Sequence, residues 1–231
     1  MTATTSSETT SLLENRFSVR SFRDAPVDDD LVERVLAAST RAPTSFNFQG
    51  YALVVVRERA RRAALAELIG KSFVAVAPAF VLVCADPGRL WDFGARHDVA
   101  VGPQHDDLGL SAVVDASLAG MCLALAAESV GLGTVMVGAV RNRVGAVSAL
   151  LDLPEGVRVL FGVAIGWTDE VRRPRPRLRP GLVVHRERYS AASRTAAADG
   201  ELWRPSGEVH DDEVAAWRSE VVRGLRMARR R

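Results

Sequence analysis

Apolar and polar residues follow two recognisable patterns along the chain. Leu31, Val32 and Val35 recur at helical spacing behind a run of aspartates that can cap a helix N-terminus. Residues 51–58 instead form a nearly continuous β-branched apolar run, which is typical of a buried strand rather than an edge strand. These patterns predict helices over residues 28–41, 59–70, 106–133, 141–153 and 211–230, and strands over residues 51–58, 77–86, 134–140 and 157–167. Because strands alternate with helices, the fold class is mixed α and β.

The segment 106–133 is the longest helical pattern and has apolar or small residues on nearly every face. About 23 helical residues would span about 35 Å, which is enough to cross a bilayer. Asp115 near its middle, Glu128 and the acidic flank oppose a membrane span. We therefore expect a helix that is buried in a core or in a dimer interface.

The two ends of the chain differ from its middle. Residues 1–11 lack the positive start and apolar block of a signal peptide, so we expect a disordered tail on a cytoplasmic protein. One domain is expected over residues 12–190, in which the Pro- and Arg-rich segment 168–189 runs extended over the surface. Residues 191–231 are expected to form a C-terminal extension with one helix.

The composition is that of an ordinary soluble globular protein, with 48% hydrophobic residues, 25% charged residues and a net charge of +2. So weak a positive charge does not favour nucleic acid as a partner. Cys84 and Cys122 lie in apolar runs, which argues against a disulfide framework or a zinc site. Lys71 is the only lysine, and it follows Gly70, a predicted helix C-cap.

The sequence contains no motif for hydrolytic or metal chemistry: GxSxG, HExxH, P-loop and CxxC patterns are all absent, and the four histidines are scattered. Arginines at predicted turns are more informative. Arg16, Ser18 and Arg20 alternate, so in an extended segment they point one way and suit a phosphate and a second anionic group. A second strip also alternates, at Arg173, Arg175, Arg177 and Arg179. Each strip alone is more often a solvated basic surface than an anion site.

Four segments occur in a family's characteristic order: "RFSVRSF", "APTSFNFQGY", "GLGTVMVGAVRN" and "PRLRPGLVVHRERY". On these segments the chain resembles the FMN-dependent nitroreductase and flavin reductase family. The third and fourth, with "LLDLPEGVRVLFGVAIGW" between them, are most similar to its oxygen-insensitive, NADPH-dependent nitroreductase branch. The resemblance covers about residues 11–190.

The resemblance implies an α+β fold of three layers, with a central mixed or antiparallel sheet flanked by helices, in an intertwined homodimer. It implies an FMN-dependent oxidoreductase that uses NADPH or NADH in ping-pong hydride transfer to nitroaromatics, quinones or flavins. The partners expected are therefore a second copy of the chain and a small aromatic or quinone-like acceptor, with neither nucleic acid nor membrane. Since the hydride chemistry belongs to FMN, no catalytic side chain and no metal site are expected.

The resemblance also assigns FMN-binding roles by position. Arg16 and Ser18 match phosphate and ribityl contacts, Arg20 matches a basic residue near flavin N1 and O2, and Arg175 and Arg177 match a pair that closes on the phosphate. The polar turn of residues 43–49, which follows the first predicted helix, supplies Pro43, Thr44, Ser45 and Asn47 to an FMN held mainly by the other subunit. The main chain of Val137, Gly138 and Ala139 matches the segment that faces flavin N5.

Four positions depart from the family's pattern. Phe17 lies at a cofactor-binding position where relatives often carry Arg or His, so one phosphate contact is expected to be missing. Gly50 and Tyr51 replace the usual Pro-Trp after Gln. Lys71 lies where relatives place an amide beside the flavin, and it either raises the flavin potential there or is an ordinary surface lysine.

Other interpretations of the sequence remain open. Within the fold, a specialised pathway enzyme would use Phe46, Phe48 and Trp91 to shape a narrower pocket, either as a dehydrogenase or as a reductive dehalogenase. Residues 91–105 have the mixed aromatic and polar composition of a mobile lid. A non-catalytic dimeric protein that binds acidic partners through its Arg-rich C-terminus is the alternative from another class. The arginines that would select NADPH are candidates by residue type only: Arg194, Arg204 and Arg218.

Overall fold

The computed structural model describes residues 7–171, 174–205 and 208–228. The chain forms two compact units, one ending at residue 172 and the other starting at residue 173. The sequence predicts a boundary at residues 190 and 191, whereas in the structure the Pro- and Arg-rich segment from residue 173 onward groups with the C-terminal residues.

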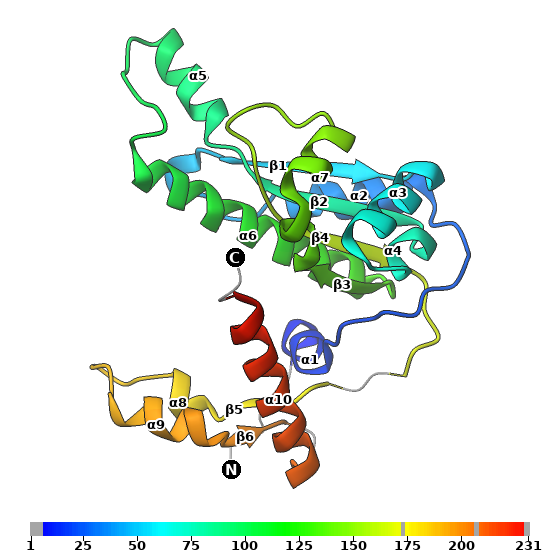
Figure 1. Cartoon of the computed structure of the whole chain (residues 1–231), viewed down its shortest axis with the longest axis vertical. Helices are drawn as coiled ribbons and strands as arrows, with labels where there is room; N and C mark the ends of the chain where they lie inside the picture. The colour runs from blue at the N-terminus through cyan, green and yellow to red at the C-terminus, as the bar shows by residue number, and fades with distance from the viewer. Residues whose placement is uncertain (1–6, 172–173, 206–207, 229–231) are drawn as a thin grey trace. The chain divides into compact units, whose positions relative to one another are not determined.

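A four-stranded sheet forms the centre of the first unit (Figure 1). Its strands are β1 (Tyr51–Val56), β2 (Ala79–Ala85), β3 (Gly133–Val137) and β4 (Arg158–Gly166), in the order β1-β2-β4-β3. Every neighbouring pair is antiparallel. Among the described residues β1 lies at an edge, so the prediction of a non-edge strand there is wrong. Its apolar run reflects helices that cover both faces of the sheet, because Val54 packs into one core and Leu53 into the other.

Two hydrophobic cores lie on opposite faces of this sheet. On the first face pack α3 (Arg59–Ile69), α4 (Phe73–Val76) and α7 (Val144–Leu150), and on the second α2 (Asp29–Ser39) and α6 (Asp106–Ser129). Strand β2 alternates between them, with Phe80 and Leu82 in the first core and Val81 and Val83 in the second. The unit therefore has three layers, helix, sheet and helix, as expected.

Helix α6 is long and apolar enough to cross a membrane by length and composition. Its small residues Ala112, Ala116 and Ala119 are buried in the second core. Gly120 leaves room for the ring of Phe161, whose nearest atom would lie 2.6 Å from a Cβ at that glycine. This face confirms the expected buried helix, while Leu110, Val114 and Leu118 form an exposed apolar stripe.

Several elements were missed or misplaced by the sequence patterns. Helix α1 (Glu8–Asn15) begins inside the expected tail, and the Ser7 hydroxyl accepts a hydrogen bond from Thr10 N–H. Helix α5 (Gly88–Arg96) occupies part of the segment interpreted as a lid. The chain turns through the 3₁₀ segments η1 (Ser45–Asn47) and η2 (Gly138–Arg143), so the predicted strand 134–140 ends at Val137.

The second unit contains an antiparallel pair of strands, β5 (Arg177–Leu178) and β6 (Leu202–Trp203). Its helices are α8 (Pro180–Val183), α9 (Ala192–Asp199) and α10 (Asp211–Ala228). The prediction of one helix after residue 190 is wrong, because the described residues there form both α9 and α10. The segment of α9, "ASRTAAAD", lacks the large apolar residues that mark an amphipathic helix.

Candidate functional site

The segment of residues 16–20 runs beside the first residues of β3. Val19 N–H donates to the carbonyl of Thr134 at 2.9 Å. Phe17 and Val19 pack with the first core, so the alternating residues Arg16, Ser18 and Arg20 are directed away from it. Phe17, predicted at a cofactor-binding position, thus has its side chain against the core.

The Arg16 guanidinium is largely buried beside Glu128 of α6. Arg16 Nε lies 3.5 Å from Glu128 Oε1, and the side chains are 16% and 9% exposed. The Thr134 hydroxyl donates to the same carboxylate oxygen. Within the part of the chain that the structure describes, buried Arg16 Nε has no hydrogen-bond partner. These residues line a hollow of about 140 Å³, in which Arg16 Nε faces the Glu128 carboxylate as an ion pair and makes no hydrogen bond to any described residue.

Arg20 is exposed, and its Nη1 donates to the Ser18 carbonyl at 3.2 Å. The backbone N–H groups of Arg20 and Ser21 both donate to Glu170 Oε2, at 2.8 and 3.0 Å. These bonds tie the end of the segment to the residues that follow β4, while the Arg20 charge stays at the surface.

The polar turn between α2 and β1 has a strained backbone. Phe46, Asn47 and Gln49 have φ values of 48°, 58° and 52°, in a region that residues other than glycine rarely adopt. The Phe46 ring is 90% exposed and lies 5.5 Å from the Phe48 ring. Such strain persists only where surrounding contacts hold it.

Asp115 of α6 provides those contacts. Its side chain is 1% exposed and accepts hydrogen bonds from Ser45 N–H at 3.0 Å and Gly50 N–H at 3.3 Å. Sequence reasoning used Asp115 only against a membrane span. Its signal was a lone carboxylate amid small apolar residues. Pro43, Thr44 and Ser45 flank a neighbouring hollow of about 350 Å³ over the exposed stripe of α6.

The predicted main-chain segment 137–139 lies where β3 passes into η2. The Val137 side chain is in the first core, so this residue offers mainly its backbone. Arg141, which sequence reasoning missed, lies over Gly138: a Cβ there would be 3.3 Å from Arg141 Nη2. Arg141 Nη1 donates to the Leu160 carbonyl at 2.6 Å, at the irregularity where the β2 to β4 register shifts.

Lys71 follows the left-handed cap Gly70, whose φ is 64° as the sequence predicts for this glycine. The lysine is exposed, and its backbone N–H donates to the Ala66 carbonyl at 2.9 Å. Helix α3 packs against η2, so Lys71 belongs to the same face of the sheet as segments 16–20 and 137–139. The turn with Thr44, Ser45 and Asn47 is instead anchored to α6 on the second face.

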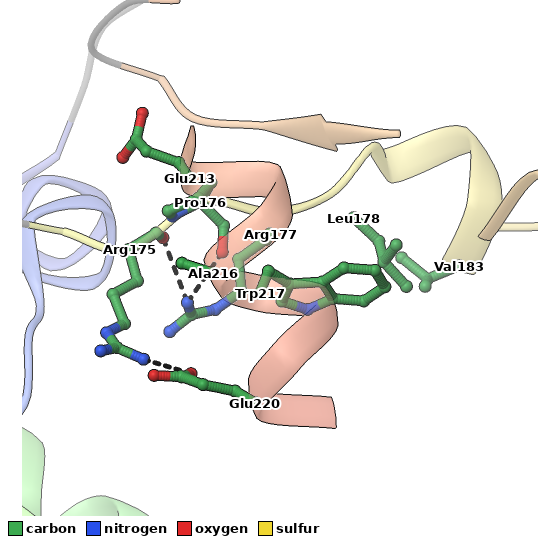
Figure 2. A pocket seen from close by; sticks show the side chains of 9 residues that line it. All are labelled: Arg175, Pro176, Arg177, Leu178, Val183, Glu213, Ala216, Trp217 and Glu220. Atoms are coloured by element: carbon green, nitrogen blue, oxygen red, sulfur yellow. Dashed lines mark hydrogen bonds and ion pairs between the residues drawn. The ribbon is translucent and has the colours of Figure 1, made fainter. Parts of the chain in front are cut away.

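Arg175 and Arg177 lie in the second unit, and Arg173 of the same strip lies outside the described residues. Figure 2 shows Arg175 reaching Glu220 of α10, with an Nη1 to Oε2 distance of 2.5 Å. This hydrogen bond raises the pKa of Arg175 above its ordinary value. Arg177 Nη1 donates to the carbonyls of Arg175 and Pro176, both at 3.1 Å. Both arginines line a pocket of about 670 Å³ together with Trp217.

Comparison with known proteins identifies the family to which this chain belongs. The Nitroreductase family profile matches residues 13–167, which contain the whole four-stranded sheet. The chain belongs to the nitroreductase family. It is 36% identical over 184 residues to an oxygen-insensitive NADPH nitroreductase of Salmonella typhimurium, covering 79% of this chain and 75% of the relative. It is 35% identical over 189 residues to an FMN reductase [NAD(P)H] of Bacillus subtilis, covering 78% of this chain and 73% of that relative.

A solved structure agrees with the family's fold. Nitroreductase A from Vibrio parahaemolyticus superposes with a TM-score of 0.80 at 29% identity, over 95% of this chain and 91% of that one. The predicted nitroreductase-like α+β fold is therefore confirmed, and the family resemblance seen in the four sequence segments is correct.

Proposed function

We propose that this nitroreductase-family chain is an FMN-dependent oxidoreductase that takes hydride from NADPH or NADH and reduces small acceptors such as nitroaromatics, quinones or free flavins. The names of the two relatives support the cofactor and the donor, since one is an NADPH nitroreductase and the other an FMN reductase using NAD(P)H. The observation that carries the proposal is the match of the nitroreductase-family profile to residues 13–167, a region that contains the largely buried Arg16 guanidinium.

The residues of segment 16–20 and Gly138 suit the parts of FMN. Arg16 and the Ser18 hydroxyl offer donors to a phosphate and a ribityl chain, because a guanidinium binds phosphate oxygens through charge-assisted hydrogen bonds. Arg20 brings an exposed cation to the same strip. Gly138 lacks a side chain where the main chain would approach a planar ring.

When bound, FMN supplies the ring that receives a hydride from the nicotinamide and passes it to the acceptor. The chain's own part is to hold that ring and place cations at its anionic groups. An enzyme in which FMN carries the hydride chemistry needs no nucleophile or general base, and the sequence contains no motif for either.

We further propose that the enzyme is a homodimer in the cytoplasm. The turn at Thr44, Ser45 and Asn47 is anchored to α6 by Asp115, whereas Arg16 lies beside Glu128, thirteen residues further along the same helix. A turn placed in this way serves an FMN held mainly by the other subunit. The exposed stripe of α6 beside the turn is apolar, as a subunit interface requires.

The cofactor proposal is tested by titrating the apo-protein with FMN and, separately, with riboflavin, which lacks the phosphate. Arg16→Ala is expected to weaken FMN binding at least about tenfold, as the loss of a charged hydrogen bond predicts. Riboflavin binding is expected to change far less. Arg34→Ala, at an exposed arginine of α2, is the matched control and should change neither affinity.

The double variant Arg16→Ala/Glu128→Gln controls for the Glu128 carboxylate, which loses its arginine in the single variant. Equal losses for FMN and riboflavin would show that Arg16 does not bind the phosphate. Failure of the wild-type protein to bind FMN would contradict the proposed function as a whole.

A further inference from the structure

We propose that Asp115 is a positioning residue, which holds the turn of residues 43–50 in the one conformation that can contact FMN. This inference rests on the proposed function. It assigns to a buried carboxylate of α6 a role in binding a cofactor that it does not itself touch.

The geometry shows a clamp with two ends. Asp115 Oδ1 accepts from Ser45 N–H at 3.0 Å and Oδ2 accepts from Gly50 N–H at 3.3 Å. All three left-handed residues of the turn, Phe46, Asn47 and Gln49, lie between these two anchored amides. The carboxylate therefore fixes both ends of the strained part, while its middle is held by bonds within the turn, such as Phe48 N–H to the Ser45 carbonyl at 2.8 Å and Gln49 Nε2 to the Asn47 carbonyl at 3.3 Å.

The chemistry of the clamp requires a carboxylate. Both partners are backbone N–H donors, and an ionised Asp offers an acceptor on each oxygen. An Asn in the same place would accept on one atom and present an NH₂ group to the other donor. Because Gly50 is buried beside Asp115, which is 1% exposed, the Gly50 amide left without its acceptor would have little access to water.

The strain explains why the clamp matters for function. A left-handed backbone at residues other than glycine is unfavourable by itself and persists only when its surroundings enforce it. Without the two bonds we expect the turn to relax into several conformations. The polar groups predicted to meet FMN, those of Thr44, Ser45 and Asn47, would then have to be ordered at the moment of binding, which lowers affinity.

A packing contact with the same helix also positions the end of the turn. A Cβ at Gly50 would lie 3.2 Å from Ala112 Cβ, so this glycine lets the start of β1 approach α6 closely. Ala112 is one turn before Asp115 on the helix. The close approach brings Gly50 N–H within reach of the carboxylate.

The test compares Asp115→Asn and Asp115→Ala with the wild type in two measurements. Hydrogen exchange of the peptide covering residues 43–51 is followed in the apo-protein, and the Kd of FMN is measured by fluorescence titration. Ser129→Ala is the matched control, since it removes a side-chain hydrogen bond to a backbone carbonyl elsewhere on α6. The isosteric Asn variant keeps the volume of the site, so hydrogen exchange and the Kd of FMN can still be measured on it if the Ala variant fails to fold.

We expect the Asn variant to exchange this peptide at least about tenfold faster and to raise the Kd of FMN by about tenfold, with a larger effect for Ala and none for the control. Visible circular dichroism of the FMN that remains bound should also change, because the turn would meet the ring differently. Unchanged exchange, or faster exchange with an unchanged Kd, would overturn the inference. A wild-type protein that binds no FMN would instead overturn the proposed function.

Discussion

Replacing Gly138 by alanine separates the fold from the proposed cofactor site. Gly138 begins η2 at the end of β3, and its φ lies outside the left-handed region, so the backbone tolerates a Cβ. The nearest atom to that Cβ would be Arg141 Nη2 at 3.3 Å, the far end of a flexible side chain. A small shift of Arg141 would accommodate the methyl group.

The two expected effects differ in size. A glycine replaced by alanine at a compatible position changes stability by about 0.4–1 kcal/mol, here mostly in the favourable direction. A methyl group inserted between the main chain and a flavin ring in van der Waals contact costs about 1–3 kcal/mol, as overpacking does in a core. That cost corresponds to an increase of about 5- to 150-fold in the Kd of FMN.

The assay measures urea unfolding of the apo-protein at one fixed protein concentration, together with the Kd of FMN. Gly145→Ala is the matched control, because its Cβ meets nothing within 4 Å and it lies in the exposed part of α7. The control should be as stable as Gly138→Ala or more so and should bind FMN like the wild type. If Gly138→Ala also binds FMN with wild-type affinity, the main chain at Gly138 does not face the ring and its assignment is refuted.

Three further outcomes follow from the described contacts. Gly162→Ala should destabilise the fold by about 1–3 kcal/mol or more in urea unfolding, since the new Cβ would lie 1.9 Å from Phe80 Cζ. Adding Phe80→Leu should recover part of the loss, and independent effects would contradict this packing. Burial raises the pKa of the Cys84 thiol to about 12, so stability should fall as the pH rises from about 8.5, where an unfolded thiol ionises, towards that value. With the other cysteine replaced by serine, a thiol reagent at about pH 8.5 should label the protein only after unfolding, and rapid labelling of the folded protein would contradict the burial. Glu220→Gln should tighten FMN binding by about two- to fivefold if Arg175 closes on the phosphate, since it removes an exposed competing carboxylate, and weaker binding would count against that role.

Most of the fold could be predicted from local patterns. The alternation of Phe80 and Leu82 with Val81 and Val83 places strand β2 between two cores, and the start of α2 is marked by the Asp28 carboxylate, which accepts from Asp30 N–H at 2.9 Å. Edge position was not predictable, because an apolar run reports which faces are covered and not which strands pair. Helix α5 was missed because its residues also have the composition of a loop.

The candidate site could be predicted only in part. Family resemblance pointed to Arg16, Gly138 and the polar turn by their positions in motifs. The residues that hold these groups are distant in sequence: Glu128 beside Arg16, and Asp115 beneath the turn. Such pairings depend on how α6 packs across the sheet, and no local pattern records them.

The visible absorption spectrum of the purified protein, recorded anaerobically before and after adding NADPH and then NADH, tests the central claim most directly. The account predicts a flavin spectrum, or one restored by added FMN, that bleaches with a pyridine nucleotide, and the relative rates would identify the preferred donor. A colourless protein that neither takes up FMN nor oxidises either nucleotide would contradict it.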